Sequence, residues 1–247
     1  SIIIIGVFYA IAALFNLFIP DTGVDHRILK FNPLFLVHEF SHCVKLLWAD
    51  KLGQISLAVT TLFWGAGATL QFIVLKWAEA ALNFPLNQAA QLQGVVALGI
   101  AIGAVLAAKI VSLRQSVKVI PLGILMGIVV MVMTLVNNLW IAIGLLIIIG
   151  GLAGFFVVPM NALLQHRGHI LMGAGHSIAV QNFNENLSIL VMLLLYALLI
   201  WLDVHIYVVI ILFGAFVSIS MTIIRKWHLT NQSKEDSLHL IGMRKIH

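Results

Sequence analysis

Seven long apolar stretches constrain the fold of this chain more than any other feature. A helix needs about 20 mostly apolar residues to cross a bilayer, and the stretches of that kind are 1–20, 54–82, 93–113, 118–136, 139–163, 172–202 and 204–225. Of the 247 residues, 62% are hydrophobic and only 9% are charged, whereas soluble domains carry about 25% charge. The sequence therefore predicts an all-α polytopic membrane protein.

The basic residues gather in alternate intervals between these stretches. Thirteen of the 14 Lys and Arg residues lie in 21–53, around 109–118, after the fifth stretch, or at the carboxyl end. Seven spans place all of these regions on one side of the membrane, and Lys76 is the exception. Because basic loops stay in the cytoplasm, we expect the link 21–53 and the carboxyl-terminal tail to be cytoplasmic.

One span, a long link and six closely spaced spans resemble the second half of a major facilitator transporter, although other six-helix bundles share this topology. We expect a transmembrane helix at 1–20, the sixth of twelve, and a cytoplasmic amphipathic linker at 21–53. A six-helix bundle at 54–225 and a loosely ordered cytoplasmic tail at 226–247 would follow. The chain starts at Ser1 inside an apolar run. This suggests a fragment whose partner is a missing N-terminal six-helix half.

The sixth apolar stretch carries a cluster of polar side chains. Gln181, Asn182, Glu185 and Asn186 lie within it, and spacings of three and four residues place the last three on one helix face. An ionisable side chain at membrane depth is costly, so it should be partnered or line a cavity. Two interpretations stay open: a transport path that contacts a cationic head group, or a structural carboxyl bonded to nearby amides.

The fifth stretch ends in polar and basic residues. Three glycines within 150–154 leave one helix face bare for close packing, and Pro159 removes a backbone donor and bends the helix. Asn161 and Gln165 then follow, one turn apart on the same face. We predict that these two amides face the interior of the bundle, where they either contact substrate or only bond to neighbouring helices.

The second stretch offers a further pair of side chains. Trp64 and Gln71 are seven residues apart, so they face the same way on a helix. The Gln71 amide could bond to a polar head group or to its neighbour helix. We include both residues in the predicted substrate site.

An HExxH motif formed by His38, Glu39 and His42 predicts an alternative function. This spacing suits a zinc metalloprotease, but a catalytic zinc needs a third protein ligand, and none stands out. Otherwise these residues form the polar face of an amphipathic helix. The sequence has no GxxxxGK[ST] motif and no CxxC pair. We therefore predict a protein that is not an enzyme and has no cofactor or metal.

Three segments carry a resemblance to a known family. TLFWGAGATLQF, GGLAGFFVVPMNALLQHRG and GAGHSIAVQNFNEN look like the second half of the bacterial lysophospholipid transporter family, a branch of the major facilitator superfamily. The resemblance implies a multi-pass inner-membrane protein that moves lysophospholipid, chiefly lysophosphatidylethanolamine. A cytoplasmic acyltransferase–acyl-carrier-protein synthetase would then re-acylate the lipid. A facilitator for a soluble solute, such as a drug or sugar, is the other alternative.

The resemblance also implies which residues bind substrate. The family pattern carries over to Trp64, Asn161, Gln165, Gln181, Asn182, Glu185 and Asn186. Gln71 departs from it, because Arg can occupy this position in the family. Glutamine keeps the capacity for hydrogen bonding but lacks the positive charge that would attract a phosphate.

Overall fold

The computed structural model describes residues 2–18, 33–234 and 241. The chain divides into two compact units, Ser1–Val37 and His38–His247. The first unit contains helix α1 (Ile2–Asn16), whose 15 residues correspond to the predicted span 1–20. Residues 19–32 of the predicted span and linker lie outside the described part, and the placement of 1–20 as the sixth of twelve spans stays a prediction.

The second unit is a bundle built on six membrane-length helical segments. They are α3 (Lys51–Leu82), α4 (Leu86–Ile110), the 3₁₀ helices η1 (Leu113–Val119) and η2 (Met133–Leu135) with α5 (Ile120–Val132) between them, α6 (Leu139–Met172), α7 (Ala174–Trp201) and α8 (Ile206–Lys234). Among the described residues, these six segments are long and apolar enough to cross a membrane. The prediction of an all-α polytopic membrane protein is confirmed, and the six predicted spans from 54 to 225 coincide with these helices.

Several boundaries differ from the sequence-based prediction: α4 begins at Leu86 rather than at 93, and α6 continues to Met172 rather than ending at 163. Helix α3 begins at Lys51 rather than at 54, because Asp50 caps it by accepting a hydrogen bond from the Gly53 N–H. Helix α8 continues to Lys234, whereas loose order was expected from residue 226. Its last turns pack against the bundle: Trp227 stacks on Trp48 with the ring centroids 6.2 Å apart.

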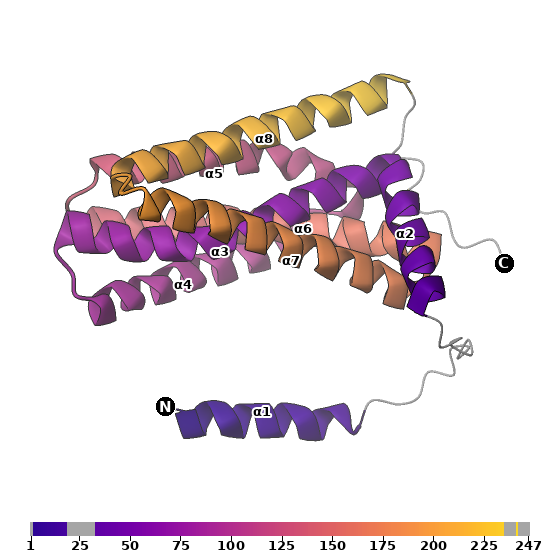
Figure 1. Cartoon of the computed structure of the whole chain (residues 1–247), viewed down its shortest axis with the longest axis horizontal. Helices are drawn as coiled ribbons and strands as arrows, with labels where there is room; N and C mark the ends of the chain where they lie inside the picture. The colour runs from indigo at the N-terminus through magenta and orange to yellow at the C-terminus, as the bar shows by residue number, and fades with distance from the viewer. Residues whose placement is uncertain (1, 19–32, 235–240, 242–247) are drawn as a thin grey trace. The chain divides into compact units, whose positions relative to one another are not determined.

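Helix α2 (Pro33–Ala49) contributes its second half, from His38 onward, to the bundle. There it lies across the end where α3 and α7 begin and where α4, α6 and α8 finish (Figure 1). Its buried residues Cys43 and Leu47 pack with Leu57 of α3. A helix lies within the predicted amphipathic linker, and its position at a membrane surface stays a prediction.

Short connections make consecutive helices antiparallel, so the helix ends alternate between the two ends of the bundle. Lys51 begins α3, Lys109 lies in the last turns of α4, and Arg225 lies near the end of α8, all at the end that carries α2 (Figure 1). Lys76 lies toward the other end. The structure thus arranges these basic residues as the alternating charge pattern predicted.

Glycines bring α4 and α6 into backbone contact. A Cβ atom added at Gly103 would collide with the Gly151 carbonyl, and one added at Gly154 would collide with the Ile100 carbonyl. Only residues without a side chain allow this approach, as the predicted close packing of the 150–154 segment required. The contact packs α6 closely against α4 in the turns that precede Asn161.

Candidate functional site

A buried polar cluster joins α6 to α7. Gln181 Nε2 donates hydrogen bonds to Glu185 Oε1 at 2.8 Å and to Asn161 Oδ1 at 3.2 Å. Gln181 is only 7% exposed and Glu185 only 8%. Their i, i+4 spacing stacks them on the face of α7 that meets α6. These three predicted site residues are therefore brought together, and Glu185 has the bond to a nearby amide that the structural interpretation expects.

A threonine on α3 lies level with this cluster. Helices α3 and α7 run side by side in the same direction, since Leu57 clusters with Val180 and Gly65 abuts Ser188. Thr61 therefore lies at the height of Glu185. Its Oγ1 is buried and has no hydrogen-bond partner within the described part of the chain. A buried hydroxyl without a partner is costly.

The other predicted amides do not join the cluster. Asn182 and Asn186 are exposed on α7, where Asn186 Nδ2 donates to the Asn182 carbonyl at 2.7 Å. Gln165 is exposed on α6, so it does not face the interior of the described bundle as predicted. Spacings of three and four residues keep Asn182 and Asn186 next to Glu185 on the helix, but Glu185 is buried with Gln181 while the two asparagines lie on the exposed edge of that face.

Trp64 and Gln71 line one cavity, as their seven-residue spacing predicted. The cavity has a volume of about 290 Å³ and lies among α3, α4, α5, α6, α7 and α8. Gln93 of α4 also lines it, and its Nε2 donates to the Gln71 backbone carbonyl at 2.8 Å. Ile189 of α7 lines the cavity one turn beyond Glu185. Along α7 the cavity therefore begins one turn from Glu185, and Asn161, Gln181 and Glu185 are not among its lining residues.

A buried ion pair at the α2 end of the bundle was missed in the sequence. Arg167 of α6 donates from Nε to Asp50 Oδ1 at 3.1 Å and from Nη2 to Asp50 Oδ2 at 2.6 Å. The two side chains are only 4% and 8% exposed. This is the two-pronged geometry in which Arg–carboxylate pairs are strongest. It fixes the beginning of α3 to the last turns of α6.

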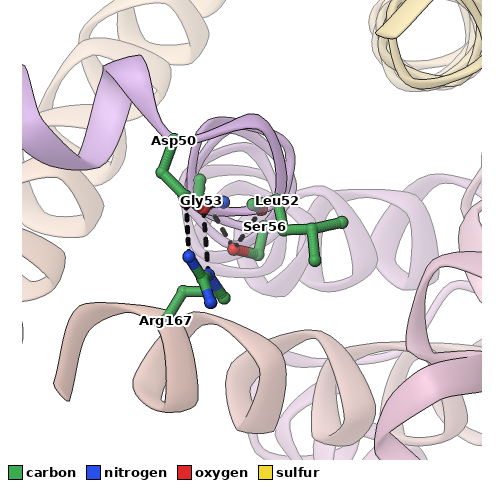
Figure 2. Close-up of polar contacts among 5 residues, drawn as sticks. All are labelled: Asp50, Leu52, Gly53, Ser56 and Arg167. Carbon is green, nitrogen blue, oxygen red and sulfur yellow. Dashed lines mark hydrogen bonds and ion pairs between the residues drawn. The ribbon is translucent and has the colours of Figure 1, made fainter. Parts of the chain in front are cut away.

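Asp50 both caps α3 and binds Arg167 of α6 (Figure 2). Its Oδ1 also accepts a hydrogen bond from the Gly53 N–H at 2.7 Å, while Ser56 Oγ in the next turn donates to the Leu52 carbonyl at 2.9 Å. The pattern of basic residues places Arg167 only as a loop charge that indicates topology. Its position directly after an amphipathic turn of an apolar helix could have indicated the ion pair. A charge inside an apolar helix needs a partner.

Comparison with known proteins identifies the family. The chain is 45% identical over 193 residues to lysophospholipid transporter LplT from Yersinia pestis and, equally, to that from Yersinia pseudotuberculosis. The match covers 78% of this chain. Over that length, the chain belongs to the LplT family. It spans about half the length of these curated relatives, because the match covers 48% of each. No protein-family model and no solved structure matches the chain.

Because LplT proteins are named as transporters, the family favours the polar-face interpretation of the HExxH motif. Glu39 lies 3.5 Å from His176 Nε2 of α7, and His38 and His42 are exposed. Among the described residues, no three His, Cys, Asp or Glu side chains are placed to hold a metal ion. The Glu39–His176 contact instead helps to seat α2 on the beginning of α7.

Proposed function

We propose that this chain takes part in moving lysophospholipid, chiefly lysophosphatidylethanolamine, across the bacterial inner membrane. The observation that carries the proposal is its 45% identity with LplT proteins over 193 residues. The lipid would be delivered to the cytoplasmic leaflet, where an acyltransferase–acyl-carrier-protein synthetase would restore its second acyl chain.

The polar cluster is suited to the head group of such a lipid. A phosphoethanolamine head carries an ammonium group beside a phosphate, and a buried carboxylate with flanking amides offers acceptors to the first and donors to the second. Glu185 would bind the ammonium, while Asn161 and Thr61 would bond to other head-group atoms. Polar partners at this depth offset the cost of bringing a charged head into the membrane.

The exposed surface of α7 favours a partner bundle that packs against this helix. In the most hydrophobic part of each helix, only 11% of α7 and 17% of α4 is buried, against 33–50% in the other four. The exposed amides of Asn182 and Asn186 would be costly against lipid tails. We propose that an N-terminal six-helix half covers this face, as in a major facilitator fold, and that the linker and tail are cytoplasmic.

The test measures lipid movement into vesicles. The chain is co-expressed with the N-terminal half of Yersinia pestis LplT, and uptake of labelled lysophosphatidylethanolamine is followed. Glu185→Gln should slow uptake at least about tenfold, because a hydrogen bond to a charged group contributes about 1.5–3 kcal/mol. Lysophosphatidylglycerol, which has no ammonium group, should be affected less.

The matched control is Glu79→Gln. Glu79 is an exposed carboxylate near the far end of α3, where it pairs with Lys76 at 3.0 Å, so uptake should stay at the wild-type rate. Uptake of a sugar or drug in place of any lysolipid would overturn the proposal and favour the alternative facilitator. Equal rates for Glu185→Gln and Glu79→Gln would remove Glu185 from the site.

A further inference from the structure

The cavity beside the polar cluster is almost wholly apolar. Its walls include Phe63 and Val74 of α3, Met126 and Val130 of α5, and Phe213 and Val217 of α8. Gln71 and Gln93 also line it, and they bond to each other where α3 meets α4. Unfilled space leaves the apolar lining side chains without packing partners, so an apolar occupant would be favoured here.

The length and direction of the cavity match one acyl chain. It is lined along α3 from Phe63 to Val74, a distance of about 16–17 Å at the helical rise per residue. Half of the hydrocarbon core of a bilayer, which one acyl chain spans, is about 15 Å. The cavity begins at Phe63, two residues beyond Thr61, and at Ile189, one turn beyond Glu185, so a head group in the cluster would direct its tail into it.

We propose that this cavity binds the acyl chain of the single-chain lipid whose head group occupies the Asn161–Gln181–Glu185 cluster, an inference that rests on the proposed function. Trp64 and Gln71 then serve as contacts to the tail rather than to the head.

Gly67 provides a direct way to fill the cavity. It lines the cavity, and a Cβ atom added there meets nothing within 4 Å. Gly67→Ala, Gly67→Val and Gly67→Leu therefore occupy the space in steps. Gly144→Leu on α6 is the matched control, because Gly144 also has open space around its Cβ position and does not line the cavity.

The experiment measures binding to the full chain in detergent micelles by fluorescence quenching. The probe is lysophosphatidylethanolamine brominated on its acyl chain, and Trp64→Phe defines the part of the quenching that arises at Trp64. We expect Trp64-dependent quenching in the wild type and in Gly144→Leu. Affinity should fall stepwise in the Gly67 series, at least tenfold for Gly67→Leu, with shorter acyl chains affected less.

Circular dichroism checks that each variant is folded, and the smaller Gly67→Ala and Gly67→Val keep the test decisive if Gly67→Leu does not fold. Equal affinities across the Gly67 series, or the absence of Trp64-dependent quenching in the wild type, would overturn the inference while lysolipid uptake could still support the proposed function. Quenching that falls along the series in a protein without lysolipid uptake would support the cavity and overturn the function instead.

Discussion

Removing the charge of Asp50 should destabilise the bundle strongly. Asp50→Asn keeps an oxygen that caps α3, since Asn is as good an N-cap as Asp, but it leaves the Arg167 guanidinium buried beside a neutral amide. Breaking a buried pair by neutralising one partner costs about 3–5 kcal/mol. For a chain of this size, about 1 kcal/mol moves the melting temperature by about 2–4 °C, so we expect a decrease of about 10 °C.

The assay is thermal unfolding of the purified chain in detergent, followed by tryptophan fluorescence. Arg167→Met alone should also destabilise, because it leaves Asp50 buried without its cation. The double variant Asp50→Asn with Arg167→Met has no buried charge and should recover most of the lost stability. A double-mutant cycle then gives the coupling between the two residues directly.

The control is the exposed pair Lys76–Glu79, whose side chains are 54% and 64% exposed at a separation of 3.0 Å. Glu79→Gln should shift the melting temperature by about 1 °C or less, because solvent screens such pairs. The reasoning is refuted if Asp50→Asn behaves like Glu79→Gln, or if the effects of Asp50→Asn and Arg167→Met simply add.

Three further predictions concern packing and reactivity. Gly103→Val should lower the melting temperature by several degrees because it separates α4 from α6, whereas Gly94→Val on the same helix, with open space around its Cβ position, should not. Trp77→Phe should cost about 1–3 kcal/mol in thermal unfolding, since it leaves the buried Met133 carbonyl without the 2.9 Å bond from Trp77 Nε1. Burial raises the pKa of the Cys43 thiol, so less reactive thiolate is present at a given pH; maleimide labelling at pH 8 should be much slower than in the unfolded chain and should rise with pH.

The sequence predicts the six spans well because their length and apolar character alone decide them. It places several helix ends wrongly, and at the beginning of α3 and the end of α8 contacts distant in the sequence decide the boundary. Asp50 begins α3 because it caps the helix and pairs with Arg167, 117 residues away. Trp227 extends α8 because it stacks on Trp48. Neither partner can be inferred from local composition.

In the candidate site, too, features set by local spacing could be predicted, and features set by distant contacts could not. Trp64 and Gln71 belong to one helix, so their seven-residue spacing was enough to place them in one cavity. The side chains of α7 were harder, because spacing indicates which residues are neighbours on a helix but not which face packs inward. Glu185 pairs with Gln181 because that face meets α6, and Asn182 and Asn186 are left outside.

Polarity decreases along α3 in the same order as along a single-chain lipid. The ion pair at Asp50 lies at the basic end of the bundle, the hydroxyl of Thr61 lies at the polar cluster, and the segment from Phe63 to Val74 lines the apolar cavity. A lipid with its head at the cluster and its tail in the cavity therefore has its head nearer the basic end. If that end is cytoplasmic, as the positive-inside rule predicts, the bound lipid already has the orientation that it takes in the cytoplasmic leaflet. The proposed site would then hold the lipid as it leaves the transporter.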